Sequence, residues 1–552
     1  TYGDKAIEFV QRDPYCLARD IRGVGFMIAD QIAMKLGISR ESDLRARAGL
    51  EFVLGELTAG GHCAYIRNDL LSRTGELLEI DLSIIERALT HSIENKRLIL
   101  RTDQRGRDLV YLPKLYYAEI DLAGKLQKLS RGKHPCPPVD FDKALEWVEK
   151  KAAIELAPAQ CSALKAAISS KVMVITGGPG VGKTTLVNSV LMVLQAKKMR
   201  VSLCAPTGRA AKRMAETTGM EAKTIHRLLQ YNPGTGGFIH KGDNPLDCDV
   251  LIIDESSMVD VLLASQLIDA VPLHAAVVIV GDADQLPSVG PGRVLQDIIR
   301  SDTIVVGHLD EVFRQASTSR IITNAHRINR GQMPEFPNEG EAGDCYFVEA
   351  DDPDKALKLI GKMVKQSIPR KFNFDPMNDI QVLTPMQKGV LGARNLNQTL
   401  QQLLNPHDDE VERFGNVYRK GDKVMQTEND YDKDVYNGDI GRIANIDSEA
   451  CELVVDFDGR SVVYDFRELD ELVLSYAITI HKSQGSEYPC VLIPLHTQHY
   501  VLLQRSLIYT AVTRAKKLVI LLGTKKALNL AVTRAESQER TTTLAERLKE
   551  SV

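Results

Sequence analysis

The chain has 552 residues, of which 44% are hydrophobic and 26% charged. This length exceeds what one hydrophobic core supports, so we expect roughly three to five domains. No apolar run approaches the roughly 20 residues of a membrane-spanning helix, and the start shows no signal pattern, which excludes a membrane protein. The net charge of −4 means that any nucleic-acid affinity must come from local basic surfaces. Because the chain does not begin with Met, we expect it to be a trimmed form.

The cysteines indicate a reducing environment. There are nine, an odd number, with no Cys-x-x-Cys pair and no nearby histidine cluster. This pattern argues against a disulfide framework and against structural zinc. We therefore expect a globular protein of the cytoplasm.

The first segment contains a glycine turn. Residues 21–30 place Gly23-Val24-Gly25 between two short helical patterns, and this arrangement resembles a helix-hairpin-helix. Such a turn lets backbone N–H groups approach a nucleic-acid phosphate without a side chain in the way. The alternative is an ordinary helical hairpin that packs on its neighbour.

Residues 44–115 predict three helices followed by a polar hairpin with its tip at 101–107. This order is typical of a winged helix. Such domains bind DNA or mediate protein contacts, so we assign no site here. The prolines of residues 134–138 then mark a linker, because consecutive prolines cannot continue a helix.

An apolar strand at 172–176 runs directly into a phosphate-binding loop. Its glycines let backbone N–H groups surround phosphate oxygens, and the helix that follows adds its positive end. Lys183 would reach the β- and γ-phosphates, and the Thr184 hydroxyl would bind Mg²⁺. A chance glycine-rich turn is the alternative, but the strand before it and the helix after it favour a nucleotide site. The residues predicted to bind ATP here are Gly178, Pro179, Gly180, Val181, Gly182, Lys183, Thr184 and Thr185.

Further apolar runs predict a parallel sheet around this loop. They lie at 172–176, 201–205, 250–253, 276–280 and 303–307. Runs that are apolar on both faces indicate strands covered by helices on both sides. At the end of the third run, Asp254 would bind Mg²⁺ and Glu255 could orient and deprotonate the attacking water. Taken alone, two adjacent acids could also belong to a solvated loop.

Several segments then follow in a specific order, at 156–160, 206–209, 224–226, 281–287, 310–315, 384–389, 479–487 and 509–515. With the phosphate loop, this order closely resembles superfamily 1 helicases, and within them the RecD family, over residues 156–522. The long N-terminal part resembles the stand-alone bacterial branch rather than the subunit of the three-part recombination nuclease complex.

The resemblance implies further roles around ATP. Gln160 would read the adenine edge, Gln285 would sense the γ-phosphate, and Gly485 and Glu487 would lie near the nucleotide. Arg314 and Arg514 would contact the γ-phosphoryl oxygens, where a planar guanidinium can donate two hydrogen bonds. Arginine fingers contribute roughly 10³ to 10⁵ in rate in other nucleotide hydrolases. Arg314 could instead form a surface salt bridge.

The resemblance also implies contacts with a single DNA strand. The residues implied are Pro206, Thr207, Arg209, Thr224, His226, Thr384, Pro385, Thr479, His481 and Lys482. Of these, His481 could instead be a packed, hydrogen-bonded histidine.

A second sheet is indicated by runs at 380–383, 491–494 and 518–522, with no phosphate loop of its own. If Arg514 sits in it, hydrolysis requires the two sheets to close on one ATP. Residues 231–240 predict a glycine-turned hairpin, either a pin that splits the duplex or a mobile loop. Short strands between 414 and 472, with a turn at Asp458-Gly459, predict an SH3-like barrel that guides the strand or braces the second sheet.

The expected fold is therefore α/β: two RecA-like parallel-sheet motor domains, a small SH3-like barrel insertion and an α-rich N-terminal region. We place a helix-hairpin-helix region at 1–43 and a winged-helix-like domain with its linker at 44–134. The first motor domain spans 135–315, with the pin at 231–247. The second spans 316–413 and 473–552 and is interrupted by the barrel at 414–472.

The predicted function is an ATP- and Mg²⁺-dependent DNA helicase. We expect it to act as a monomer on single strands and on single–double-strand junctions without sequence preference. The resemblance implies 5′→3′ travel. The alternative is a DNA-stimulated ATPase that remodels protein–DNA complexes without separating strands. A scaffold with an inactive nucleotide site is disfavoured by the full set of motif residues. Nuclease activity has no support, since no separate carboxylate cluster occurs.

Overall fold

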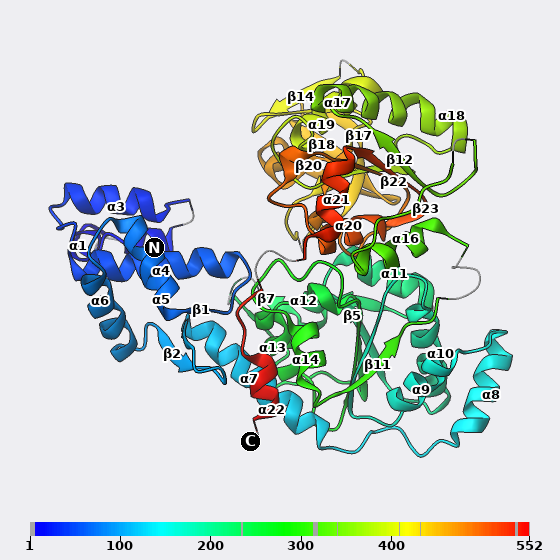
Figure 1. Cartoon of the computed structure of the whole chain (residues 1–552), viewed down its shortest axis with the longest axis horizontal. Helices are drawn as coiled ribbons and strands as arrows, with labels where there is room; N and C mark the ends of the chain where they lie inside the picture. Colours follow the sequence, from blue (N-terminus) through cyan, green and yellow to red (C-terminus); the bar gives the residue numbers. More distant parts are fainter. Residues whose placement is uncertain are drawn as a thin grey trace.

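The structure, a computed structural model, describes residues 6–21, 23–232, 234, 236–312, 318–338, 340–407, 409–430, 432–535 and 539–550. It consists of a helical N-terminal region and two α/β lobes, which lie one above the other in Figure 1. No helix in these ranges is long and apolar enough to cross a membrane.

The N-terminal region begins with three short helices that pack against a longer one. They are α1 (Ala6–Arg12), α2 (Cys16–Asp20), α3 (Phe26–Lys35) and α4 (Asp43–Ala59). The predicted glycine turn lies between α2 and α3, where Gly23 has a φ of +95° that favours glycine. Phe26 stacks on Tyr15. Arg45 of α4 pairs with Asp30 of α3 at 2.9 Å, which anchors the turn on the longer helix.

The next elements are the predicted three helices and polar hairpin, with one further strand that the sequence analysis did not predict. After α4 come β1 (Ala64–Ile66), α5 (Arg67–Leu78), α6 (Leu82–Glu94), β2 (Ile99–Thr102), β3 (Asp108–Tyr111) and α7 (Pro113–Ser130). The strands form an antiparallel sheet of order β1-β3-β2. Asp103 accepts the backbone N–H groups of Arg105 and Arg107, which fixes the tip of the β2–β3 hairpin. Helix α8 (Phe141–Ala152) follows the proline-rich linker.

The first lobe is built on a six-stranded parallel sheet of order β11-β4-β10-β9-β5-β6. Its strands are β4 (Val172–Gly177), β5 (Val201–Ala205), β6 (Ala222–Thr224), β9 (Val250–Ile253), β10 (Ala276–Gly281) and β11 (Val305–Leu309). Its helices are α9 (Pro158–Ala167), α10 (Lys183–Ala196), α11 (Gly208–Thr218), α12 (Ile225–Leu229), η2 (Ser256–Met258), α13 (Val261–Asp269) and α14 (Val294–Ser301). Val277 and Ile279 enter one core and Val278 and Val280 the other. The prediction of strands covered on both faces is thus confirmed for the central strands β4, β9 and β10, whereas β11 is a partly exposed edge strand.

The second lobe contains a five-stranded parallel sheet of order β12-β23-β22-β13-β21. Its strands are β12 (Cys345–Glu349), β13 (Ile380–Thr384), β21 (Ala477–Thr479), β22 (Tyr488–Leu495) and β23 (Ala515–Gly523). Its helices are α16 (Arg320–Asn329), α17 (Pro353–Lys362), the π-helical turn η3 (Met363–Ser367), α18 (Ile368–Phe372), α19 (Ala393–Leu404), η5 (His481–Ser483), η6 (Thr497–His499), α20 (Arg505–Val512) and α21 (Lys525–Thr533).

An antiparallel insertion extends the second lobe. It contains the hairpin β14 (Glu410–Arg413) and β15 (Asn416–Arg419), then β16 (Lys423–Gln426), β17 (Ile440–Asp447), β18 (Glu452–Phe457), β19 (Arg460–Asp465), η4 (Phe466–Glu471) and β20 (Leu472–Leu474). Asp458 and Gly459 form the predicted two-residue turn, with φ of +52° and +90°. The insertion shares one continuous core with the second lobe, so it packs as part of that lobe.

A short hairpin, β7 (Tyr231–Asn232) and β8 (Gly237–Phe238), projects between α12 and β9. Both strands lie within the hairpin predicted at 231–240, and residues 233 and 235 lie outside the described part.

The end of the chain returns to the first lobe. Helix α22 (Leu544–Lys549) lies beside α7 in Figure 1, far from the second sheet. Leu544 and Leu548 are buried in the core of the first lobe. The sequence-based boundary carried the second motor domain to residue 552, and the structure corrects this. The reason is that the apolar side chains of α22 pack against α7 and α14.

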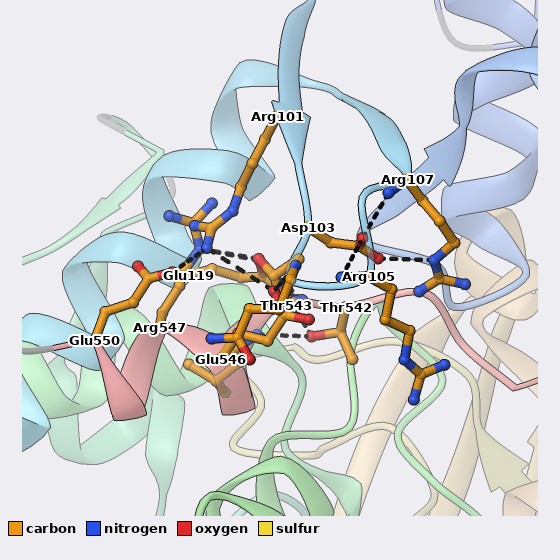
Figure 2. A network of polar contacts seen from close by, with 12 residues as sticks. Arg101, Asp103, Arg105, Arg107, Glu119, Thr542, Thr543, Glu546, Arg547 and Glu550 are labelled. Carbon is orange, nitrogen blue, oxygen red and sulfur yellow. Dashed lines mark hydrogen bonds and ion pairs between the residues drawn. The ribbon is translucent and has the colours of Figure 1, made fainter.

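Polar contacts also hold the residues that lead into α22. Figure 2 shows Thr542, Thr543 and Arg547 converging on Glu119 of α7. Glu119 is fully buried and accepts from the Thr542 hydroxyl at 2.6 Å and from the Thr543 N–H at 3.1 Å.

Candidate active site between the two lobes

The phosphate loop connects β4 to α10. Gly180 and Gly182 have φ of +74° and +78°, so the turn depends on glycine at both positions. Gly177 has no room for a side chain, since a Cβ there would lie 2.6 Å from the Leu309 carbonyl oxygen of β11. The loop is thus locked between the strand and the helix whose first residue is Lys183.

A cavity of about 430 Å³ lies between this loop and the second lobe. Gly178–Gly180, Gly182–Thr184, Asp254, Glu255 and Gln285 line it from the first lobe. Glu487, Thr513, Arg514 and Lys516 line it from the second lobe. The structure therefore brings the predicted phosphate-binding residues and Arg514 to one site.

Lys183 lies at the mouth of the loop. Its Nζ donates to the carbonyl oxygens of Gly177 and Gly178, the latter at 2.9 Å. The Thr184 side chain is exposed toward the same cavity. An ammonium and a hydroxyl at the start of a helix form a suitable site for phosphate oxygens.

The two predicted acids differ in their electrostatics. Burial and the carboxylate of Glu255 raise the pKa of Asp254 above its usual range. Burial also opposes the ionisation of Glu255, but Arg213, Arg514 and Lys183 outweigh it and hold its pKa below the usual range. Glu255 has a φ of +50°, an uncommon conformation for a residue with a side chain, which orients its carboxylate into the cavity.

Arg213 of α11 is a site residue that the sequence analysis missed. Its Nη2 donates to Glu255 at 2.7 Å, and its Nη1 contacts Glu487 of the second lobe at 2.5 Å. One guanidinium thus joins the proposed base to the opposite lobe. The only sequence signal is its position one helical turn after Arg209, within a segment assigned to the DNA strand.

Arg514 is 2% exposed. Its Nε donates to the Thr510 carbonyl oxygen at 3.2 Å and its Nη1 to that of Ser486 at 3.3 Å. Carbonyl partners orient a guanidinium without cancelling its positive charge. The side chain is therefore fixed at the edge of the cavity that contains the phosphate loop. The second predicted finger, Arg314, lies outside the described residues.

The segment 281–287, which contains the predicted γ-phosphate sensor Gln285, also connects the lobes. Gln285 donates to Asp282 at 3.2 Å, and Tyr509 of the second lobe donates to the same carboxylate at 2.8 Å. The Gln285 Oε1 atom is buried without a protein partner among the described residues. A glutamine so placed has a free acceptor near the cavity.

Four of the predicted nucleotide residues do not line the cavity. Gln160 is 1% exposed and donates to the carbonyl oxygens of Val181 and Gly182, both at 3.3 Å. Val181 is buried in the core, and Thr185, in the first turn of α10, is not among the residues that line the cavity. Gly485 lies further off, where a Cβ would stand 2.7 Å from the Thr207 hydroxyl. Gly485 thus contacts the segment predicted to hold DNA.

The segment 206–209, which is predicted to contact DNA, lies against the second lobe. Thr207 caps α11 by accepting the N–H of Ala210 at 3.2 Å, and Pro206 precedes it. Arg209 donates to Ser486 and to the Tyr488 hydroxyl, each at 2.9 Å. The predicted strand-contacting turn therefore faces the loop that carries Gly485.

Other predicted DNA residues have structural roles. The Thr224 hydroxyl caps α12 through the N–H of Arg227 at 3.1 Å. Thr384 is fully buried and donates to the Leu391 carbonyl oxygen at 2.6 Å, and Pro385 is buried beside it. These side chains hold their own loops in shape, and their contact with DNA stays a prediction.

The remaining predicted contacts are more accessible. His481 and Lys482 are exposed, and Thr479 accepts the N–H of Lys482 at 3.4 Å. His226 packs against the hairpin, with its ring 5.6 Å from that of Phe238. The histidine thus links the proposed strand path to the proposed pin.

Comparisons with known families agree with this architecture. The family described as "AAA domain" matches residues 160–291, and "UvrD-like helicase C-terminal domain" matches 474–522. The family described as "ATP-dependent RecD-like DNA helicase SH3 domain" matches 396–457. The family described as "ATP-dependent RecD2 DNA helicase HHH domain" matches 1–64.

Individual relatives span most of the chain. An "ATP-dependent RecD2 DNA helicase" of Deinococcus radiodurans is 34% identical over 99% of this chain and 75% of its own length. A "RecBCD enzyme subunit RecD" of Mycolicibacterium smegmatis is 30% identical over 68% of this chain and 72% of its own length. A solved Pif1 helicase from Bacteroides is 19% identical, with a TM-score of 0.43 over 69% of this chain and 94% of its own.

Two parallel-sheet lobes meet at one phosphate-loop cavity, and together with the matches to helicase families they define a superfamily 1 helicase core. The insertion and the N-terminal region make the assignment more specific. The chain belongs to the family of ATP-dependent RecD2 DNA helicases.

Proposed function

We propose that this protein hydrolyses ATP between its two lobes and uses the resulting motion to travel along one DNA strand and displace the other. One observation carries the proposal. Lys183 and Thr184 of the first lobe and Arg514 of the second line a single cavity. A nucleotide bound there would contact both lobes, so its hydrolysis would change how they are held together.

The phosphates of ATP would replace the carbonyl contacts of Lys183, and Arg514 would donate to the γ-phosphoryl oxygens as negative charge develops. Arg314 would contribute in the same way, although it lies outside the described residues. Gln285 offers its unpartnered Oε1 to orient water or to sense the γ-phosphate. Gln160 would read the adenine from its place against the loop.

Thr184 and Asp254 suit Mg²⁺. The ion takes hard oxygen ligands and is commonly held by one or two protein groups plus substrate phosphates. The exposed Thr184 hydroxyl and the Asp254 carboxylate supply such oxygens on the cavity wall. When bound, the ion would neutralise phosphate charge. No larger cluster of metal-binding side chains occurs among the residues that the structure describes.

The strand would bind across the outer edges of both lobes. Thr207, Arg209, Thr479, His481 and Lys482 supply hydrogen-bond donors and positive charge there. Such side chains contact phosphate and sugar, so binding would tolerate any sequence. It would also weaken with salt: the logarithm of the binding constant would change with the logarithm of the salt concentration with a slope of about −0.7 per contacted phosphate. We further propose 5′→3′ travel, action as a monomer at single–double-strand junctions, and a cytosolic location.

A strand-displacement assay tests the proposal. Duplexes with either a 5′ or a 3′ single-stranded tail are incubated with the protein, ATP and Mg²⁺, and the released strand is measured. We expect release from the 5′-tailed substrate only, and none with Lys183→Ala or Arg514→Ala. Failure on both substrates, with ATPase still stimulated by single strands, would instead favour the remodelling ATPase.

A further inference from the structure

Another cavity, of about 540 Å³, lies next to the candidate active site. It is lined by α11 of the first lobe, by residues 485–488 of the second lobe and by strands β16, β17 and β18 of the insertion. We call it the insertion cavity. Its volume falls within the range of about 300–1,000 Å³ typical of ligand pockets.

The insertion cavity and the candidate active site share one wall. Arg213, Glu216, Glu487 and Lys516 line both of them. Within this wall, Glu487 contacts Arg213 at 2.5 Å and Lys516 at 3.4 Å. Arg213 also donates to Glu255, the proposed base. Because that base would activate the water that attacks the γ-phosphate, the shared wall lies at the γ-phosphate end of the proposed nucleotide.

Lys423 of β16 brings a buried positive charge to the insertion cavity. The residue is 6% exposed, and its Nζ donates to the Ile380 carbonyl oxygen at 3.5 Å. It forms no ion pair with any residue that the structure describes. Burial and neighbouring positive charge lower the pKa of Lys423 to about 7, although the more distant carboxylates of Asp375 and Asp379 oppose this shift. An anion in the cavity would supply the missing opposite charge.

Arg442 adds a second positive charge beside the first. Lys423 and Arg442 are direct partners in the antiparallel pair of β16 and β17, so their side chains point to the same face of the sheet. Like charges in directly opposed positions are destabilising. Asp456, the partner of Arg442 on β18, instead accepts the N–H of Gly459 at 2.7 Å, and Arg442 has no ion pair within the described part of the chain. A bound anion would relieve the repulsion between these two cations.

The lining of the insertion cavity is positive as a whole. It contains six Lys or Arg and four Asp or Glu side chains. Lys212 pairs with Asp458 at 2.5 Å, which cancels one charge of each sign. Arg209 donates to two uncharged hydroxyl groups and keeps its charge. The excess of positive charge therefore lies on the side where Lys423 and Arg442 face the cavity.

We propose that the insertion cavity receives the orthophosphate released by ATP hydrolysis, and that Lys423 and Arg442 bind this anion on its way out of the protein. The inference rests on the function proposed above. Attack of water on the γ-phosphorus breaks the bond to the β-phosphate oxygen and gives ADP, orthophosphate and one proton. ADP still fills the phosphate loop, so the free phosphate leaves on the other side, where the contact between Arg213 and Glu487 opens to let it pass.

Product inhibition by added orthophosphate tests the site. Phosphate in the insertion cavity blocks release without touching the nucleotide, so it should slow hydrolysis even at saturating ATP. Phosphate in the phosphate loop would instead compete with ATP. ADP formation by the whole chain is measured with oligothymidylate at constant ionic strength, while the ATP and phosphate concentrations are varied. The absence of inhibition, or its disappearance at saturating ATP, would overturn the proposal.

Arg442→Gln removes one cation from an exposed position of the cavity. We expect the inhibition constant for phosphate to rise about fivefold. The matched control is Arg413→Gln, which removes the same charge from β14 of the same insertion, where the guanidinium lies over the Phe466 ring outside the cavity. Equal inhibition constants for the two variants would also overturn the proposal. Lys423→Met should give a rise similar to that of Arg442→Gln, and if it does not fold, the two arginine variants decide.

Two further measurements separate this inference from others. The affinity of the same variants for labelled oligothymidylate is measured by fluorescence anisotropy without ATP. Weaker DNA binding by Arg442→Gln, with unchanged phosphate inhibition, would overturn the proposal in favour of a DNA phosphate in this cavity. Strand displacement by the unaltered protein is measured in the same preparation. Its absence refutes the proposed function, whereas its presence together with equal inhibition constants refutes the phosphate site alone.

Discussion

Arg213 offers the sharpest test of how ATP hydrolysis is controlled. Its guanidinium donates to Glu255 at 2.7 Å while also contacting Glu487 of the opposite lobe at 2.5 Å. A carboxylate held in this way is a poor base, because its acceptor oxygen is engaged and its pKa lies below the usual range. We therefore predict that Arg213→Gln raises ATP hydrolysis in the absence of DNA.

The size of the effect follows from the contact. Glu255 is 8% exposed on its side chain, and a hydrogen bond between charged groups in such a place contributes about 2 kcal/mol. If hydrolysis requires this bond to break, removing it raises the basal rate by up to about thirtyfold, at one factor of ten per 1.4 kcal/mol. The rate with saturating DNA should change little, so the stimulation ratio falls by a similar factor.

The assay is steady-state ATP hydrolysis with and without oligothymidylate. Lys516→Gln serves as the matched control, because Lys516 also pairs with Glu487, at 3.4 Å, but shows no contact with Glu255. It should leave the stimulation ratio near that of the unaltered protein. An unchanged ratio in Arg213→Gln, or an equal fall in both variants, would refute the reasoning.

Three further changes have defined outcomes. Burial raises the pKa of Asp297 to about 7. The free energy of unfolding should therefore fall by up to roughly 4 kcal/mol as the pH rises from about 4 through 7. Thermal melts of Asp297→Asn should lack this pH dependence. Gly485→Ala forces a Cβ to within 2.7 Å of the Thr207 hydroxyl and should lower DNA-stimulated hydrolysis, whereas Gly415→Ala, strained at φ +73° with no neighbour within 4 Å, should not. Deleting residues 232–239 should abolish strand displacement but spare translocation measured on single strands, and loss of neither would favour the remodelling ATPase.

The parallel sheets were predictable because their strands are buried on both faces. Such strands form continuous apolar runs, as at β4 and β10, where alternate side chains enter two different cores. The strands that the analysis missed lack this signal. β6 has only three residues, and most of the side chains of β12 are only partly buried. Their pairing depends on strands from elsewhere in the chain.

The site was predictable where the backbone carries the chemistry, as in the phosphate loop. It was less predictable where a threonine hydroxyl could either contact DNA or hold the protein's own backbone. Thr207, Thr224 and Thr384 occupy similar motif positions, yet the structure uses the first two as helix caps and buries the third. Sequence patterns also cannot place the C-terminal residues 539–550. Their position depends on Glu119, which is 423 residues from Thr542 along the chain.

Helix α11 explains why strand binding and ATP hydrolysis should be coupled. Residues four apart lie on the same face of a helix, so Arg209 and Arg213 both face the second lobe. Arg209 contacts Ser486 at 2.9 Å and Arg213 contacts Glu487, the next residue in the same loop. A strand that draws Arg209 away would shift this loop relative to the helix. The bond between Arg213 and Glu255 lies one turn further along, and it would loosen in the same movement.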